Sequence, residues 1–528
     1  MSAARNFASI LALSAALLVP APQAAAATIL VTKTADTADG SCDADCSLRE
    51  AVILANSSTN ADIIEVPAGH YRLTITGPPE DAGLSGDLEV MNSVTINGAG
   101  AGSTLIDAGG MTGLGERVFE VAAFDTSSMF DVTFSGLTIT GGWATGGFAD
   151  NSGGGIEVRG GADVALVDVG IIDNYVSFSG AGLQTEPDSI LTLLRTTVAE
   201  NSTTFNGLGA GIMASGESVT IDDSTISHNS AMANGGGIVV FAATLTVRNS
   251  TISANRADAS GGGISADASA VVDLRNVTLT DNVADDDNDG NGDGGGIHRG
   301  NSAITMRNTI LAGNRDVSTI GTVHPDCTGG VTSGGYNLVG NLTGCTFTPG
   351  AGDRTGVQPV VGPLADNGGP TQTHALLPGS QAIDGGNPGP PGSGGAACQA
   401  SDQRGAPRST CDIGAYELVR CGGTVVNRVG TEGPDKLVGT PGPDGFLALG
   451  GNDLVKGLGG NDAACLGPGH DIGAGGGGKD RLFGEQGKDR LKGQGGNDRL
   501  VGGPGKDTCV GGRGKKDKAA CETEKSVP

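Results

Sequence analysis

Aromatic residues are scarce in this chain. They make up 3% of 528 residues and include a single Trp, whereas glycine contributes 94 residues. An average protein contains much less glycine, about 7% of its residues. A repetitive fold, with glycine at its bends and short aliphatic side chains in a thin core, explains both features.

Positive charge is scarce as well. Lys and Arg total 32 against 58 Asp and Glu, which gives a formal net charge of −26. Nucleic acids and anionic membranes bind basic patches, so this balance argues against both as partners. Cations and basic surfaces are the expected partners.

Long apolar runs are missing after the N-terminus. Arg5 precedes an apolar run from Ile10 to Val19, and the small residues Ala24–Ala27 follow. This order is typical of a secretory signal peptide, here over residues 1–27. No later run has the length of a membrane-spanning helix, and no lipid-anchor cysteine follows the signal. We therefore expect a mature chain that is secreted, extracellular or loosely associated with a cell surface, and monomeric.

The CxxC spacing of zinc sites is absent. Ten cysteines, an even number in a chain expected to be exported, favour disulfides. Sequence alone leaves the connectivity open, but nearness along the chain favours five pairs: Cys42 with Cys46, Cys327 with Cys345, Cys398 with Cys411, Cys421 with Cys465, and Cys509 with Cys521.

The most regular feature that is present lies near the C-terminus. Nine aspartates recur at a strict nine-residue interval, each with glycine two positions before it: Asp435, Asp444, Asp453, Asp462, Asp471, Asp480, Asp489, Asp498 and Asp507. A chain that bends every nine residues stacks aspartates i and i+18 on one edge, about 4.8 Å apart. Carboxylates that close repel one another unless a cation lies between them. Carboxylate and backbone carbonyl oxygens suit Ca²⁺, which predicts a calcium site at each repeat.

The other positions of the repeat agree. The residues two after each aspartate are mostly apolar and are expected to fill the interior, with Gly473 as the exception. Residues 430–510 therefore resemble the hemolysin-type, or RTX, calcium-binding repeats, although 430–435 and 439–444 keep only the outer glycines of the consensus. The resemblance implies a calcium-binding β-roll, assigned here to residues 419–521. The alternative is a Gly/Asp tract without metal, in which interleaved Lys and Arg residues offset the carboxylate charge.

The long middle of the chain also repeats. Six asparagines lie 26 to 32 residues apart, and the positions three, eight and ten before each one are always apolar: Asn174, Asn201, Asn229, Asn255, Asn282 and Asn314. The apolar positions eight and ten before each asparagine are two residues apart, which is the alternation of a β-strand with one face inward. A period of about 27 residues with three short strands is typical of a parallel β-helix. We therefore predict an all-β fold, a right-handed parallel β-helix similar to the pectate-lyase-like solenoids over residues 62–345, followed by the parallel β-roll.

Both ends of this solenoid need a cover against edge pairing. Ser47 and Glu50 form a predicted capping box at the start of a short amphipathic helix, and Cys46–Asn56 resembles the CSLREA domain, here given residues 28–61. Residues 362–384, 402–405 and 411–417 resemble the choice-of-anchor Q module, which places a C-terminal cap over 346–418. Both resemblances imply exported, repetitive surface proteins and carry no catalytic residues.

An acidic insertion widens the spacing before Asn314. It reads D-x-D-x-D-G from Asp285, Asp287 and Asp289, the first half of an EF-type loop, but Gly296 stands where the bidentate acid is expected. A weak second calcium site and a solvated acidic loop remain equally good interpretations.

Three arginines recur in the same repeat, Arg248, Arg275 and Arg307. Stacked guanidinium groups bind carboxylates, which makes an acidic polysaccharide a candidate ligand. Like charges at strand spacing repel one another, so the preferred interpretation is that these arginines pair with nearby acids. The candidate partners are Asp222, Asp223 and Asp273.

Catalytic groups are hard to find in the sequence. The outward positions of the regular repeats lack a dense cluster of acids, and the aromatic residues are scattered. The six histidines share no spacing and are expected at the surface or in turns, with His228 the least implausible base. The sequence thus predicts a secreted or cell-surface calcium-binding β-solenoid protein that is not an enzyme and has an adhesion or surface-interaction role, with an extracellular polysaccharide or cell-surface polymer as a candidate partner. The alternative is a polysaccharide lyase or glycoside hydrolase with a calcium-binding tail.

Overall fold

The computed structural model describes residues 26–58, 60–77, 83–122, 129–144, 151–514 and 517–525. The predicted signal peptide lies outside these residues except for its last two positions. Parallel strands dominate the described part of the chain, which contains one α-helix, α1 (Leu48–Asn56), and one short 3-10 helix (Gly110–Thr112). None of its helices has the length and apolar character needed to cross a membrane.

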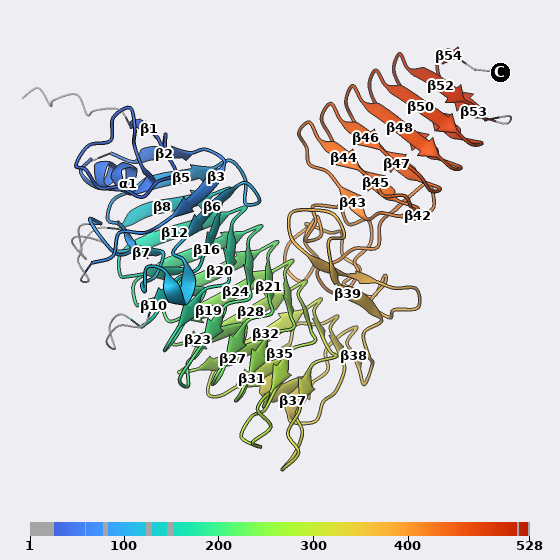
Figure 1. The fold of residues 1–528 in the computed structure, drawn as a ribbon. Helices are drawn as coiled ribbons and strands as arrows, with labels where there is room; N and C mark the ends of the chain where they lie inside the picture. The colour runs from blue at the N-terminus through green and yellow to red at the C-terminus, as the bar shows by residue number, and fades with distance from the viewer. Residues whose placement is uncertain are drawn as a thin grey trace, which may run out of the picture.

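A long solenoid, here called the rod, comprises the first 38 strands of the described chain (Figure 1). Twenty of them form one sheet with two parallel ladders that meet at β35. The first ladder runs through β1 (Thr28–Leu30), β2 (Asp62–Val66), β5 (Val94–Gly98), β8 (Phe130–Ser135), β12 (Ala162–Val167), β16 (Ile190–Leu194), β20 (Ser218–Asp222), β24 (Thr244–Arg248), β28 (Val271–Arg275), β32 (Ala303–Arg307), β35 (Cys327–Ser333) and β37 (Cys345–Thr348). The second runs through β4 (Leu88–Val90), β7 (Phe119–Val121), β11 (Ile156–Val158), β15 (Leu183–Thr185), β19 (Ile212–Ala214), β23 (Ile238–Phe241), β27 (Ile264–Asp267) and β31 (Ile297–Arg299).

Two further parallel sheets complete the rod. The first contains β3 (Gly69–Arg72), β6 (Thr104–Asp107), β9 (Thr138–Thr140), β13 (Gly170–Ile172), β17 (Thr197–Ala199), β21 (Thr225–Ser227), β25 (Thr251–Ser253), β29 (Thr278–Thr280), β33 (Ile310–Leu311), β36 (Leu338–Val339) and β38 (Arg354–Thr355). The second contains β10 (Trp143–Ala144), β14 (Tyr175–Val176), β18 (Ser202–Thr203), β22 (Ser230–Ala231), β26 (Arg256–Ala257), β30 (Val283–Ala284) and β34 (Arg315–Asp316). The sheets extend beyond the predicted limits of 62 and 345, because β1 pairs with β2 and β38 pairs with β36.

The predicted apolar columns lie in register inside the rod. One column is buried along its whole length: Val164, Leu191, Val219, Leu245, Val272 and Ile304. Successive strands pair these residues directly, so the core grows by one layer per coil. The period read from the sequence is therefore the coil period of the structure.

The asparagines that mark the period form a buried ladder. The Nδ2 group of Asn255 donates to Oδ1 of Asn282 at 2.9 Å, and its own Oδ1 accepts from Nδ2 of Asn229 at 2.9 Å. The same bonds repeat from Asn174 onward until Asp326 accepts the last one from Asn314 at 2.9 Å. Each buried amide is satisfied by the next coil, which fixes the corner of the rod.

The predicted short helix with its capping box is present before the second strand of the rod. The Ser47 side chain accepts from the backbone N of Glu50, and the Glu50 carboxylate accepts from the backbone N of Ser47, which confirms the capping box. Helix α1 then buries Leu48, Val52 and Ala55 against the first strands of the rod.

The segment predicted to cap the C-terminal end lies elsewhere. Residues 361–418, here called the cover segment, include the hairpin β39 (Val361–Ala365) and β40 (Thr373–Leu376) and run back along the side of the rod (Figure 1). His374 Nε2 lies 2.8 Å from Ser253 Oγ, and Thr251 Oγ1 donates to Gln403 at 2.6 Å. His374, expected at the surface or in a turn, is buried. The outward Ser and Thr residues of these coils are therefore occupied by the chain itself.

A second, thinner solenoid, here called the roll, follows a short hairpin of β41 (Arg420–Cys421) and β42 (Thr424–Val425). One parallel sheet contains β43 (Arg428–Val429), β45 (Gly445–Leu447), β47 (Ala463–Cys465), β49 (Arg481–Phe483), β51 (Arg499–Val501) and β53 (Lys518–Ala520). The other contains β44 (Lys436–Val438), β46 (Leu454–Lys456), β48 (Ile472–Gly477), β50 (Arg490–Gly495), β52 (Thr508–Gly512) and β54 (Thr523–Lys525). Strands pair at a register of 18 residues, as the nine-residue repeat predicts.

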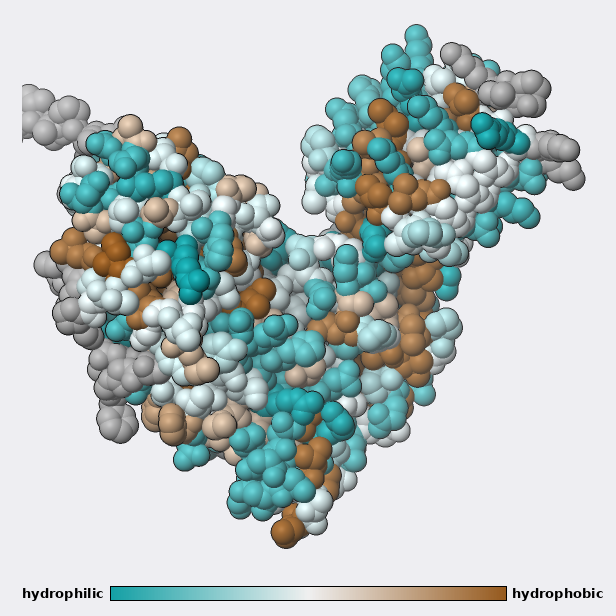
Figure 2. All heavy atoms as spheres, in the orientation of Figure 1, coloured by the Kyte–Doolittle hydropathy of each residue, from teal (hydrophilic) through white to brown (hydrophobic). Residues whose placement is uncertain are grey.

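Between the two sheets lies a single layer of side chains. Phe446, Val455, Leu482, Leu491 and Leu500 are buried there, and the gap left by glycine at 473 is lined by leucines of neighbouring turns. Figure 2 shows that the roll projects from the rod and that a notch separates it from the N-terminal coils. All five expected disulfides are formed, and the described residues include no free cysteine.

Candidate metal centre

The aspartates of the roll form two ladders, one on each edge. In the first ladder, Oδ1 of each aspartate accepts the backbone N–H of the aspartate 18 residues earlier, at 2.8 to 2.9 Å: Asp453, Asp471, Asp489 and Asp507. The second ladder repeats this bond at 2.9 to 3.0 Å: Asp462, Asp480 and Asp498. One oxygen of each carboxylate is thus used by the fold itself.

The other carboxylate oxygen, Oδ2, accepts no hydrogen bond from the described residues in seven of the nine aspartates. It is buried and has no hydrogen-bond partner among the described residues at Asp453, Asp462, Asp471, Asp480, Asp489, Asp498 and Asp507. An unpaired buried carboxylate oxygen is costly, on the order of 1–3 kcal/mol or more. Seven such atoms in regular array make these two edges a candidate site for a positively charged ligand.

Backbone oxygens lie beside these carboxylates. A Cβ built on Gly484 would stand 2.5 Å from Oδ2 of Asp489 and 2.5 Å from the carbonyl oxygen of Gly502. Glycine at this position therefore leaves a space that carboxylate and carbonyl oxygens both face. Oxygen-only surroundings of this kind fit Ca²⁺, which takes six to eight oxygen ligands in flexible geometry.

The electrostatics favour a positively charged ligand beside these carboxylates. Burial raises the pKa of Asp462, Asp471 and Asp498 to about 6, against the lowering effect of the backbone N–H that each carboxylate accepts. Neighbouring aspartates raise these pKa values further. A divalent cation supplies the opposite charge that would keep the carboxylates ionised.

Asp435 and Asp444 differ from the other seven. Their Oδ2 atoms are hydrogen-bonded, by Thr431 and Thr440 respectively. The sequence places all nine aspartates in one series, and the structure divides the series at this point.

The acidic insertion of the rod brings its three predicted residues together. Carboxylate oxygens of Asp285, Asp287 and Asp289 lie within 4.8 Å of one another. Oδ1 of Asp285, however, already accepts the backbone N–H groups of Asp289 and Gly290 at 3.0 and 3.1 Å. The loop is held by its own backbone, as a solvated acidic loop would be.

A second group beside this insertion was not anticipated from the sequence. Asp293, Asp316 and His324 also place possible ligand atoms within 4.8 Å of one another. His324 Nδ1 lies 2.5 Å from Oδ1 of Asp293, and the Asp316 carboxylate accepts from Ser318 and from the His324 backbone. These groups satisfy one another. The residues come from different coils, which sequence spacing does not reveal.

The arginine column pairs with acids, as preferred from the sequence. Arg248 contacts Asp222 through two bonds of 2.7 and 2.8 Å, and Arg275 contacts Asp273. Arg307 lies 3.6 Å from the same Asp273. Because the guanidinium groups already have carboxylate partners, they do not form an open site for an acidic polymer.

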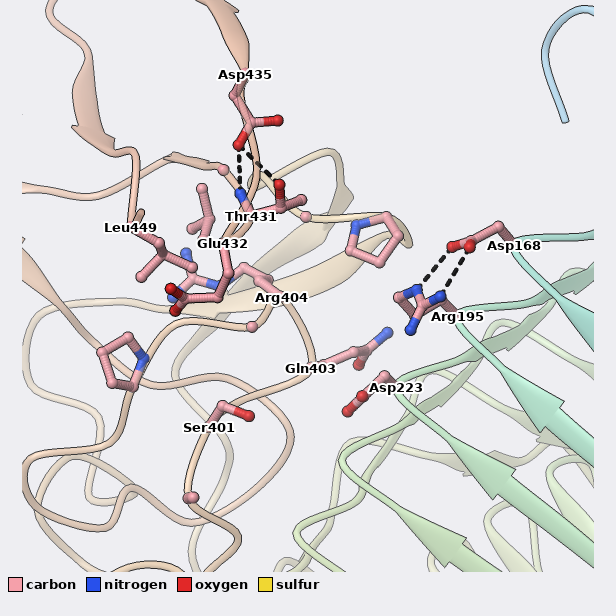
Figure 3. Close-up of a pocket in the computed structure, with 17 residues that line it drawn as sticks. Asp168, Arg195, Asp223, Ser401, Gln403, Arg404, Thr431, Glu432, Asp435 and Leu449 are labelled. Carbon is pink, nitrogen blue, oxygen red and sulfur yellow. Dashed lines mark hydrogen bonds and ion pairs between the residues drawn. The ribbon is translucent and has the colours of Figure 1, made fainter. Parts of the chain in front are cut away.

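A cavity of about 920 Å³ lies where the rod, the cover segment and the first coil of the roll meet (Figure 3). The rod contributes the Arg195–Asp168 ion pair and Asp223, whose pKa burial raises to about 6. The roll contributes Asp435 and Thr431, joined by two hydrogen bonds. The first repeat of the roll is therefore one wall of this junction.

An acid–arginine cluster lies on the early, irregular coils of the rod. Arg117 contacts both Glu120 and Glu157, which occupy paired positions on β7 and β11. Arg159 contacts the same two carboxylates at 2.8 and 3.0 Å. Burial raises the pKa of Glu120 to about 7 despite both arginines. The regular repeats gave no sign of this cluster, because the two glutamates lie in coils of different length.

The aromatic residues are less scattered than the sequence indicated. Trp143 and Tyr175 occupy paired positions on β10 and β14, with ring centroids 5.2 Å apart, and the Tyr175 hydroxyl donates to Asp173 at 2.6 Å. Phe178 and Phe205 lie just after β14 and β18 and are 46% and 81% exposed. Phe178 and Phe205 thus follow neighbouring strands of the sheet that also carries Trp143 and Tyr175, and these four residues are here called the aromatic corner.

Two family models match this chain and agree with its architecture. A model of right-handed β-helix regions matches residues 154–348, and a model of RTX calcium-binding nonapeptide repeats matches 429–464, 466–498 and 483–515. No curated protein matches the chain.

Three solved structures are similar to it at low identity. A pectate lyase is 12% identical, with a TM-score of 0.36 and coverage of 75% of this chain and 97% of the lyase. The A-module of a mannuronan C-5 epimerase from Azotobacter vinelandii is 16% identical, with a TM-score of 0.25 and coverage of 60% and 93%. An ORF18 protein of Geobacillus virus E2 is 13% identical, with a TM-score of 0.29; the alignment covers 62% of this chain and 60% of the viral protein.

Proposed function

We propose that this chain, which combines a right-handed β-helix with RTX calcium-binding repeats, is an exported, non-catalytic surface protein whose tail requires calcium. The observation that carries the proposal is the array of seven buried Oδ2 atoms without partners. Bound calcium would supply the positive charge that these carboxylates lack. The rod would then present its free faces to an extracellular polymer.

Calcium would stabilise the folded form of the roll. The aspartate ladders bring like charges together, and the roll has only a single layer of apolar side chains to hold its sheets. A ligand that binds only the folded form shifts the equilibrium toward that form. Calcium is scarce inside cells and abundant outside, so the roll would remain loose before export and become ordered afterwards.

Several features support export. The N-terminal apolar run, the resemblance of residues 28–61 to CSLREA domains and the resemblance within 346–418 to choice-of-anchor Q modules all belong to exported proteins. Five disulfides are consistent with an oxidising compartment.

The aromatic corner supports polymer binding and is the surface that we propose for it. Exposed rings flanked by hydrogen-bonding groups offer an apolar face and polar contacts together, as polysaccharide recognition needs. The cover segment occupies much of another side of the rod, which leaves this corner as the better surface.

Retention on insoluble polysaccharides, both polyuronate and neutral glucan, tests this assignment. Phe205→Ala should weaken retention, whereas Phe241→Ala should not, because Phe241 is similarly exposed, at 50%, but lies at the end of β23. Equal retention of the two variants would argue against the corner. Release of soluble oligosaccharides during the assay would argue against a non-catalytic role.

The acid–arginine cluster supports a second candidate, a polysaccharide lyase or glycoside hydrolase. Glu120 has a pKa near neutrality, as a general acid or base needs. Against this role, the four charged groups pair with one another, so a substrate would have to displace those contacts. Turnover of polyuronates that Glu120→Gln or Glu157→Gln abolishes would establish the enzyme instead.

A further inference from the structure

We propose that Thr431 and Thr440 replace the metal ion in the first coil of the roll, so that this coil folds without calcium and serves as the edge on which the calcium-dependent coils assemble. The inference rests on the proposed function, because it divides the nine aspartates into seven that bind calcium and two that do not. It predicts fewer calcium sites than the sequence repeat does.

The threonines donate to the oxygen that is unpaired elsewhere. The backbone N of Thr440 lies 2.6 Å from Oδ2 of Asp444 and its hydroxyl lies 2.9 Å from the same atom. Thr431 makes the same two bonds to Oδ2 of Asp435, at 2.5 and 3.0 Å (Figure 3). Two donors stabilise the carboxylate in the position where a cation would otherwise be required.

The backbone conformation also differs between the seven unpaired aspartates and the other two. The residue four positions before each of the seven unpaired aspartates has a positive φ, between 67° and 109°: Leu449, Leu458, Gly467, Gly476, Glu485, Gln494 and Gly503. Four of these residues are not glycine, although L side chains rarely adopt this conformation. Thr431 and Thr440, at the equivalent positions, do not have a positive φ. Sites that need a ligand thus share a turn with a left-handed residue, and the threonine turns do not.

An uncharged residue, Asn427, precedes the first aspartate of the second ladder. Asn427 stands one coil before Asp444, and its Nδ2 donates to Oδ1 of Asp444 at 3.0 Å, while its Oδ1 accepts from the backbone N of Gly445 at 3.0 Å. The first aspartate of the second ladder thus accepts a hydrogen bond from an uncharged amide group. No additional negative charge is brought against Asp444 from that side.

Contacts outside the repeat also hold the first coil. The buried Arg404 donates to the carbonyl oxygen of Val426 at 3.1 Å and lies 3.7 Å from the centre of the Tyr416 ring. The Cys421–Cys465 disulfide joins the entry hairpin to β47. The start of the coil is therefore fixed to the cover segment by a bond that does not depend on metal.

These observations give the roll a direction of assembly. Without calcium, β43 and β45, which pair with each other, remain folded and expose a parallel edge with unpaired backbone groups, whereas β44 loses its strand partner β46. Each later coil contacts mainly its neighbours, so calcium-driven folding proceeds from this edge toward the C-terminus. The wall of the junction cavity that Thr431 and Asp435 form persists in either state.

Hydrogen exchange with mass spectrometry on the oxidised full chain tests the proposal. In EDTA, the amides of Gly430, Thr431, Thr440 and Gly445, whose hydrogen-bond acceptors all lie within residues 427–447, should stay protected while those of 454–501 exchange; with calcium, both sets should be protected. The double variant Thr431→Val, Thr440→Val should lose this protection in EDTA, whereas Thr523→Val, at an exposed threonine of the last strand, should not. Equal exchange of both regions in the wild-type protein in EDTA would overturn the inference.

Calcium stoichiometry, by equilibrium dialysis and elemental analysis, gives a second measurement. Asp444→Asn should leave the bound calcium unchanged and Asp471→Asn should lower it. Thr431→Gly, Thr440→Gly restores the consensus glycine and should raise bound calcium above wild type. If Asp444→Asn lowers the stoichiometry as Asp471→Asn does, the two threonines are not substitutes for metal. If the wild-type protein binds no calcium at all, the proposed function itself fails, which is a separate outcome.

Discussion

Replacement of Asn255 by leucine should destabilise the rod strongly. Asn255 is fully buried, and its Oδ1 accepts two bonds from Asn229, from the backbone N at 3.1 Å and from Nδ2 at 2.9 Å. Its Nδ2 donates to the carbonyl oxygen of Ile226 and to Oδ1 of Asn282, each at 2.9 Å. Leucine has a similar volume but offers none of these groups.

The expected cost follows from the bonds that are lost. Two donors on Asn229 lose their acceptor inside the protein, and each unsatisfied buried group costs about 1–3 kcal/mol. The free energy of unfolding should therefore fall by about 2–6 kcal/mol, a large part of the 5–15 kcal/mol that is usual for a domain. Thermal and urea unfolding in excess calcium, followed by circular dichroism, measures this change while the roll stays loaded.

Asn301→Ala provides the control. Asn301 is exposed and accepts a single bond, from the backbone N of Ser269 at 3.1 Å, so its loss should change stability by no more than about 0.5 kcal/mol. If Asn255→Leu changes the free energy of unfolding by no more than the control does, the asparagine ladder does not stabilise this corner of the rod.

Three further changes test other parts of the molecule. Ile252→Asn places an amide at a fully buried core position and should cost about 2–5 kcal/mol; an unchanged melting temperature would contradict the assigned core. Glu120 has a folded-state pKa of about 7, above the ordinary 4.5, so its contribution to stability is present below pH 4.5 and is lost as pH rises through 7. Glu120→Gln should therefore remove part of the decline in melting temperature between pH 5 and 8, whereas a larger decline would show that the ionised carboxylate is favourable. Replacement of both Cys421 and Cys465 by serine should loosen the first coils of the roll in EDTA, measured by proteolysis, and equal resistance would show that the disulfide is dispensable there.

The fold could be predicted from the sequence wherever one residue type recurs at a fixed period. The core column through Leu245 and the 18-residue register of the aspartates follow from spacing alone, because stacked coils place equivalent residues in direct contact. Nearness in sequence also gave the correct disulfides.

Contacts between distant segments could not be predicted in this way. His374 meets Ser253 across 121 residues, and nothing in either local sequence indicates that the cover segment turns back along the rod. Glu120 and Glu157 occupy paired positions on β7 and β11, but they precede the regular repeats, so the period of the asparagines does not relate them. The division of the aspartates depends on backbone φ and on which group donates to Oδ2, and both become visible only when Thr440 is seen beside Asp444.

Isothermal titration of the purified, oxidised full chain with calcium tests the central claim most directly. The seven unpaired carboxylate oxygens predict a saturable heat that chelator abolishes and that falls when Asp471 or Asp489 is changed to Asn. Absence of saturable heat at millimolar calcium would show that these carboxylates are not metal ligands and would contradict the account.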